Sequence, residues 1–176
     1  MLKRLPKSQD ILQVYAVIAV MFSGWTITAF LRKLPSWLLT LNMGEIFTVF
    51  SYAMVANLVE SLIVLLLLLS LCVLFPLRIL RDDFAVRGTI LSVGFIGSLM
   101  TFLGLLRQFG IEISIRSLIG PLAVVFLTAF LLIFSAKIRF LHSAVLWISD
   151  RLIVFLYILI PLFITLSVYI VFRNIV

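Results

Sequence analysis

The sequence of 176 residues contains little charge for its length. Charged residues make up 12% of the chain and hydrophobic residues 64%, whereas ordinary globular domains carry about 25% charged residues. The mean hydropathy of +1.32 agrees with this bias. Composition therefore excludes an ordinary soluble domain and predicts an all-α integral membrane protein, with one transmembrane helical domain over residues 1–176 and no soluble domain.

Cysteine and histidine each occur once, and this excludes several kinds of site. Cys72 has no partner for an intramolecular disulfide. His142 alone cannot supply the two imidazoles of a bis-histidine haem, or of a zinc site that needs two histidines from one chain. The lysines lie outside the centres of the apolar runs, which argues against a buried retinal Schiff base. We therefore expect no cofactor and no metal.

Recognisable catalytic motifs are also lacking, so an enzyme is not the favoured expectation. There is no nucleophile elbow, no phosphate-binding glycine loop and no zinc-protease helix. Adjacent Asp82 and Asp83 could hold a divalent cation that acts on a phosphate-bearing lipid. The favoured alternative is a solvated loop in which neighbouring arginines balance the two negative charges. His142 has no acid near it in the sequence, which favours an interfacial residue over a general base.

Long apolar runs are what the sequence does have. Five of them are long enough to cross a hydrocarbon core of about 30 Å, which takes roughly 20 helical residues. Their continuity favours helices over the alternating strands of a barrel. The first exceeds the apolar region of a signal peptide, so it is expected to be retained. We predict a bundle of about five transmembrane helices, with spans near 11–31, 58–77, 89–106, 118–136 and 152–172.

The second run is too long for one crossing. A helix from Ile46 to Leu77 would measure about 48 Å at about 1.5 Å per residue. Counting back from Arg78, Glu60 lies about 27 Å away, close to the opposite edge of the hydrocarbon. Residues 46–59 are therefore expected either to extend the helix beyond the membrane or to lie in the interface. Residues 137–151 present a similar choice, between an interfacial amphipathic helix and an extension of the fifth span.

Basic residues outnumber acidic ones by 14 to 7, which gives a formal charge of +7. They lie at the ends of the apolar runs, where they would meet anionic head groups, so membrane lipids rather than nucleic acid are the expected partners. Nine Lys and Arg residues fall on the N-terminal side of the membrane and five on the other. This bias predicts a multi-pass cell-membrane protein with a cytoplasmic N-terminus and an external C-terminus.

Polar residues interrupt the second run at Tyr52, Asn57 and Glu60, which we assign to one helical face. The inferred topology places them on the same side of the membrane as Arg107 and Arg116. Ionisable groups inside a membrane are functional candidates and usually have a partner. Arg107 is the expected partner of Glu60, and Arg116 is the second choice. A glutamate that snorkels to the interface or forms a structural ion pair is the simpler alternative to a transport or catalytic role.

Glycine and proline positions predict helix contacts and breaks. Gly120-Pro121 is expected to begin the fourth span, where a missing amide proton has no cost. Pro161 frees the carbonyl of Tyr157 in the middle of the fifth span, which predicts a kink. Small residues at three- and four-residue spacing predict close helix packing within the bundle, rather than a dedicated oligomer face, along Gly94, Gly97, Ser98, Thr101 and Gly104.

Three functions are compatible with these features. A non-enzymatic subunit or scaffold, which binds other membrane proteins, further copies of itself or lipids, is favoured because the spans hold few polar groups. A small channel or transporter, either alone or as a homo-oligomer, would need Asn57, Glu60, Gln13 or the serines to line a wet path at an interface. A lipid-processing enzyme would use Glu60 or the Asp82-Asp83 pair.

Overall fold

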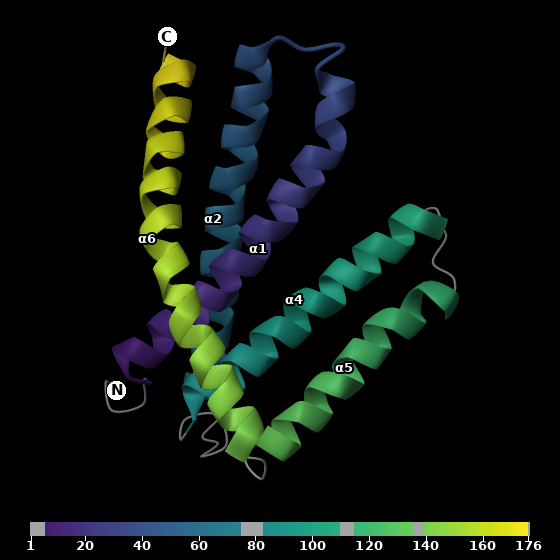
Figure 1. The fold of residues 1–176 in the computed structure, drawn as a ribbon, viewed down its shortest axis with the longest axis vertical. Helices are drawn as coiled ribbons and strands as arrows, with labels where there is room; N and C mark the ends of the chain where they lie inside the picture. The colour runs from purple at the N-terminus through teal and green to yellow at the C-terminus, as the bar shows by residue number, and fades with distance from the viewer. Residues whose placement is uncertain (1–5, 75–82, 110–114, 136–138, 176) are drawn as a thin grey trace.

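The chain is all-helical wherever its structure is described. The computed structural model describes residues 6–74, 83–109, 115–135 and 139–175, and their side chains except at 108–109, 115–117 and 134–135. This confirms the all-helical class for the described residues. The helices are α1 (Ser8–Trp37), α2 (Met43–Leu74), α4 (Phe84–Phe109), α5 (Ile115–Ser135) and α6 (Arg139–Ile175) (Figure 1).

Four of these helices are long and apolar enough to cross a membrane, namely α1, α2, α4 and α6. The side chains of the fifth helix, α5, are described only over 118–133, and that stretch is apolar. The five apolar runs of the sequence therefore fall on five helices, and four of these have the length and hydropathy of a span within the described residues.

Helix α2 joins the predicted second span to the residues before it. It is continuous from Met43 to Leu74, so residues 46–59 extend the span and do not form a separate interfacial helix. A reciprocal cap begins it: Glu45 N–H donates to Asn42 Oδ1 and Asn42 N–H donates to Glu45 Oε2, each at 2.9 Å. Such a cap satisfies amides for which the first turn has no intrahelical acceptor. Leu77, the predicted end of the span, lies outside the described residues.

Helix α6 is likewise longer than its predicted span, because it runs without interruption from Arg139 to Ile175. The described residues before position 152 therefore extend the fifth span. The helix changes direction along its length: its first part lies near the end of α5, and its second part runs beside α2 (Figure 1). Pro161 lies inside it, and its carbonyl accepts a hydrogen bond from Thr165 Oγ1 at 2.8 Å. The kink at this proline stays a prediction.

Helix α5 begins earlier than expected. It starts at Ile115, so the expectation that Gly120-Pro121 begins the helix is wrong. Proline removes one backbone hydrogen bond, the one to the carbonyl four residues earlier, and the helix continues through it. The carbonyl of Pro121 itself accepts a hydrogen bond from Ser98 Oγ of α4 at 3.3 Å, which joins the two helices at this level.

The helices form two groups. Helices α1, α2 and α6 make up the long unit, in which α1 packs against both others, and α4 and α5 pair as an antiparallel hairpin (Figure 1). The hairpin joins the long unit through contacts of α4 with α1, and it reaches only part of the way toward the end where α1 and α2 turn (Figure 1). The N-terminal and C-terminal ends of the described chain lie at opposite ends of the molecule.

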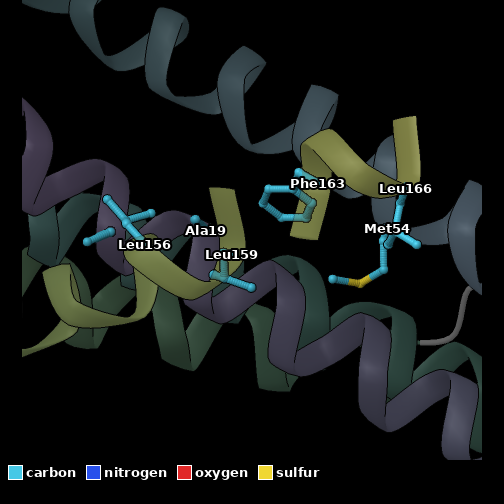
Figure 2. Close-up of a cluster of buried hydrophobic side chains, with 7 residues drawn as sticks. Ala19, Met54, Leu156, Leu159, Phe163 and Leu166 are labelled. Atoms are coloured by element: carbon cyan, nitrogen blue, oxygen red, sulfur yellow. The ribbon is translucent and has the colours of Figure 1, made fainter. Parts of the chain in front are cut away.

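Two clusters of buried apolar side chains hold this arrangement, and α1 contributes to both. Figure 2 shows the cluster that joins the long unit, with Met54 of α2 close to Leu166 of α6. Its buried members are Ala16, Ala19, Met54, Leu156, Leu159, Phe163 and Leu166. The second cluster joins α1 and α2 to α4 through Val14, Ile18, Val64, Leu68, Phe84 and Ile96.

Candidate functional site

A cleft of about 320 Å³ lies between α1, α2 and the end of α4, and we call it the α1–α2 cleft. Its walls combine aromatic rings and small residues with a group of charged and polar side chains. That group comprises Lys33 from α1, Asn57 and Glu60 from α2, and Arg107 from α4. The cleft therefore holds three of the five residues of the polar cluster predicted from the sequence.

Small side chains leave the space and aromatic rings shape its wall. Ala29 of α1 faces the cleft together with Ala53 and Ala56 of α2. Phe30 packs edge-on against Trp37, with ring centroids 5.5 Å apart. Lys33 Nζ lies 5.9 Å from the centroid of the Trp37 ring, within the range of a cation–π contact. This contact orients the ammonium group at the wall of the cleft.

Asn57 is the most enclosed polar residue of the cleft, with 1% of its surface exposed. Its Nδ2 donates to Ser23 Oγ of α1 at 3.2 Å. Its Oδ1 has no hydrogen-bond partner among the described residues. A buried acceptor without a donor costs about 1–3 kcal/mol, and this oxygen is enclosed by the protein rather than open to the cleft.

Glu60 and Arg107 line the same cleft, and both are exposed. Within the part of the chain that the structure describes, neither forms an ion pair, and the one contact there between side chains that can carry opposite charges joins His142 to Asp83. The structure thus brings Glu60 near its expected partner without pairing them. The side chain of Arg116 lies outside the described ones.

Tyr52 belongs to a different site. Its hydroxyl donates to Asn174 Oδ1 of α6 at 3.0 Å, whereas Asn57 is bonded to α1. The five positions between Tyr52 and Asn57 turn the helix by about 140° at about 3.6 residues per turn. One partner helix cannot meet both side chains, which is why the predicted single face divides between two neighbours.

Tyr52 is part of a hydrogen-bonded contact that we call the α2–α6 seam. Thr48 Oγ1 and Tyr169 Oη lie 3.1 Å apart. Arg173 Nη1 donates to the same Tyr169 oxygen at 3.2 Å and to the Gly44 carbonyl at 3.4 Å. These bonds fasten the last turns of α6 to the first turns of α2.

Sequence reasoning did not associate Lys33 or Ser23 with the cleft. Both lie on α1, and their closeness to α2 depends on how the two helices cross, which the sequence pattern of one helix does not give. One signal was present: Ala53 and Ala56 are spaced by three residues, so they lie on one face of α2. Side chains this small leave room beside that face, and the cleft lies there.

Two other candidates from the sequence, Asp83 and His142, lie close together at the end of the molecule opposite the α1–α2 turn. His142 Nε2 lies 3.4 Å from Asp83 Oδ1, which joins the start of α6 to the residue before α4. The acid near His142 is distant in sequence, so no local spacing could reveal it. Asp82 lies outside the described residues. Within the described ranges, no three His, Cys, Asp or Glu side chains are placed to hold a metal ion.

The small residues of α4 divide between two environments. A Cβ added at Gly94 would overlap the side chain of Thr128 on α5, and one at Gly97 would lie 3.7 Å from Val124. Ser98 bonds to the same helix, as described above. A Cβ at Gly104 would meet no atom within 4 Å, and Thr101 bonds to the Ser98 carbonyl of its own helix at 2.9 Å. Helix α5 therefore approaches the first part of the stripe most closely.

An apolar crevice of about 440 Å³ lies where α4, α5 and α6 meet α1. Thr89 of α4 is on its wall, and Thr89 Oγ1 is buried without a hydrogen-bond partner among the described residues. Four other helical threonines donate to the carbonyl four residues earlier, namely Thr28, Thr48, Thr128 and Thr165. The crevice carries no charged side chain, and this separates it from the α1–α2 cleft.

Comparisons with protein-family models, with curated proteins and with solved structures found no match to this chain.

Proposed function

We propose that the chain is a non-enzymatic, multi-pass membrane protein that acts as a subunit or scaffold by holding a membrane component in the α1–α2 cleft. The membrane setting is supported by four helices of sufficient length and hydropathy. It is also supported by the exposed apolar side chains of these helices, such as Leu66 of α2 and Ile164 of α6. Lipid tails are as apolar as leucine and cover such surfaces without cost.

The observation that carries the proposal is the charge inside the cleft. Lys33, Glu60 and Arg107 line one cavity, and no ion pair joins them among the described residues. Charges at the edge of the hydrocarbon can be satisfied by water and lipid head groups. A ligand in the cleft that carries opposite charges can take over these contacts, so pairing with the three groups would hold it there.

The orientation that we propose places the cleft toward the outer leaflet. Nine basic residues on the N-terminal side against five on the other support a cytoplasmic N-terminus and an external C-terminus in the cell membrane. In this orientation the α1–α2 turn and the end of α4 face outward. Lipids of the outer leaflet and neighbouring membrane proteins then have access to the cleft.

The test is whether the full-length protein, purified in mild detergent, retains a membrane component in native mass spectrometry. Ala56→Trp fills the cleft, and Ala123→Trp places the same ring on an exposed position of α5. We expect wild type and Ala123→Trp to keep the component, and Ala56→Trp to lose roughly tenfold in occupancy, equivalent to about 1.4 kcal/mol. Size-exclusion profiles establish that each variant is folded.

Two results would contradict the proposal. One is a wild-type protein that carries no lipid and no foreign subunit. The other is equal occupancy in the two tryptophan variants, which would place the component outside the cleft. Robust single-channel currents from the protein alone in liposomes would instead support the channel alternative.

A further inference from the structure

We propose that the α1–α2 cleft selects phospholipids whose head group joins a phosphate to a primary ammonium, with the phosphate held by Arg107 and Lys33 and the ammonium by Glu60. This inference rests on the proposed function and names the chemical class of the membrane component. It follows from the signs of the charges in the cleft, from the hydrogen-bonding capacity of Glu60 and from the size of the cavity.

The cleft carries charges of both signs, which is the first step. Arg107 presents a planar guanidinium that matches phosphate oxygens in a bidentate manner, and Lys33 presents a point charge. Both line the cavity that Glu60 lines. A head group with a phosphate alone would pair with the cations and leave Glu60 next to an anion. A head group that also carries a cation gives each of the three side chains an opposite charge.

Glu60 distinguishes a primary ammonium from a quaternary one. A primary ammonium has three N–H donors and can hydrogen-bond a carboxylate. A trimethylated ammonium has none. Asn57 lines the same cleft, but its Oδ1 is buried. The carboxylate of Glu60 therefore favours the ligand that donates.

The space and its surroundings suit a head group attached to acyl chains. A volume of about 320 Å³ lies at the lower end of the roughly 300–1,000 Å³ of small-molecule sites. Exposed Val59 and Ile63 flank Glu60 in the sequence of α2, and Leu31 is exposed near Lys33 on α1. These residues give acyl chains an apolar surface beside the polar cavity, so the head group can enter while the chains remain in the bilayer.

The experiment titrates the full-length protein in mild detergent with three phospholipids that have the same acyl chains, and counts bound lipid by native mass spectrometry. The lipids are phosphatidylethanolamine, phosphatidylcholine and phosphatidylglycerol. We expect wild type to bind phosphatidylethanolamine roughly tenfold more tightly than phosphatidylglycerol, a difference of about 1.4 kcal/mol. Phosphatidylcholine should bind more weakly than phosphatidylethanolamine, because it lacks the N–H donors.

Charge-neutralising variants test the assignment of each group. Glu60→Gln should abolish the preference for phosphatidylethanolamine over phosphatidylglycerol, because it removes the partner of the ammonium and the repulsion of the anion. Arg107→Gln and Lys33→Gln should weaken both lipids and keep their ratio. Arg32→Gln is the matched control, because Arg32 is exposed next to Lys33 and does not line the cleft. If Glu60→Gln does not fold, the wild-type lipid series and Lys33→Gln still decide the question.

Equal or tighter binding of phosphatidylglycerol by wild type would overturn the proposed selection, and so would an unchanged lipid ratio in Glu60→Gln. Either result leaves the proposed function in place if Ala56→Trp still displaces the bound component. If wild type retains no phospholipid, the proposed lipid selection is overturned. A foreign subunit bound in the cleft would then show that the proposed function holds without a phospholipid.

Discussion

The long unit and the hairpin are both built from apolar helices, and the two groups differ in helix length and in the way the helices pair. Helices α1, α2 and α6 have 30, 32 and 37 residues, or about 45, 48 and 55 Å at about 1.5 Å per residue. Helices α4 and α5 have 26 and 21 residues, or about 39 and 32 Å. The hairpin therefore stops short of the end where α1 and α2 turn, and the α1–α2 cleft lies there.

The contacts differ in chemistry as well. The long unit combines a buried apolar cluster with hydrogen bonds between helices, such as Thr48 with Tyr169 and Asn57 with Ser23. The hairpin depends on small residues, with Gly94 against Thr128, together with the hydrogen bond from Ser98 to the Pro121 carbonyl. Hydrophobicity distinguishes neither pairing, because all five helices are apolar, and in the membrane setting that we propose lipid would remove the hydrophobic drive between helices. Side-chain size and hydrogen bonding determine which helices meet.

The largest expected effect tests the apolar cluster of the long unit. Phe163 is 2% exposed, and Phe155, eight residues earlier on the same helix, is 51% exposed. Phe163→Ala should lower the free energy of unfolding in detergent by about 3 kcal/mol, the lower end of the range for Phe→Ala, because apolar solvent replaces part of the lost contact. Phe155→Ala should change it by less than about 1 kcal/mol. Equal losses would contradict the role of the cluster.

An intermediate effect tests the hairpin. Gly94→Leu places side-chain atoms where Thr128 lies, and Gly104→Leu enters open space. Overpacking costs about 1–3 kcal/mol, so we expect the first variant to unfold at a lower denaturant concentration than the second. Adding Thr128→Ala to Gly94→Leu should recover part of the loss. If the two leucine variants are equally stable, the close contact does not hold the hairpin together.

The smallest effect tests the α2–α6 seam. A double-mutant cycle of Thr48→Val and Tyr169→Phe should give a coupling of about 0.6 kcal/mol, the average of interhelical hydrogen bonds measured in a membrane protein. The cycle measures unfolding in detergent for wild type, both single variants and the double variant. Additive losses would show that the 3.1 Å contact contributes nothing to stability.

Much of the fold could be predicted from the sequence because each long apolar run marks the position of a helix. The runs near 11–31 and 152–172 fall inside α1 and α6, although both helices are longer. The ends of the helices could not be predicted, because hydropathy locates only the apolar stretch of a helix. The polar turns beyond that stretch leave no hydropathy signal. The cap of Asn42 and Glu45, which begins α2, is a polar signal that the span count did not use.

The candidate site was predicted in part, for reasons of geometry. Asn57, Glu60 and Arg107 do line one cleft, and their proximity was inferred from membrane depth. Lys33 and Ser23 were missed because their contacts depend on how α1 crosses α2. Tyr52 was assigned to the same face as Asn57, although the angle between the two positions on a helix sends them to different partners.

The unequal helix lengths have a consequence for the bilayer in the setting that we propose. Helix α5, with 21 residues, is about 32 Å long at about 1.5 Å per residue, which matches a hydrocarbon core of about 30 Å. Helices α1, α2 and α6 exceed that thickness by about 15–25 Å, so in a bilayer they must tilt or carry their end turns beyond the hydrocarbon. The long unit should therefore reach into the head-group region where α5 does not.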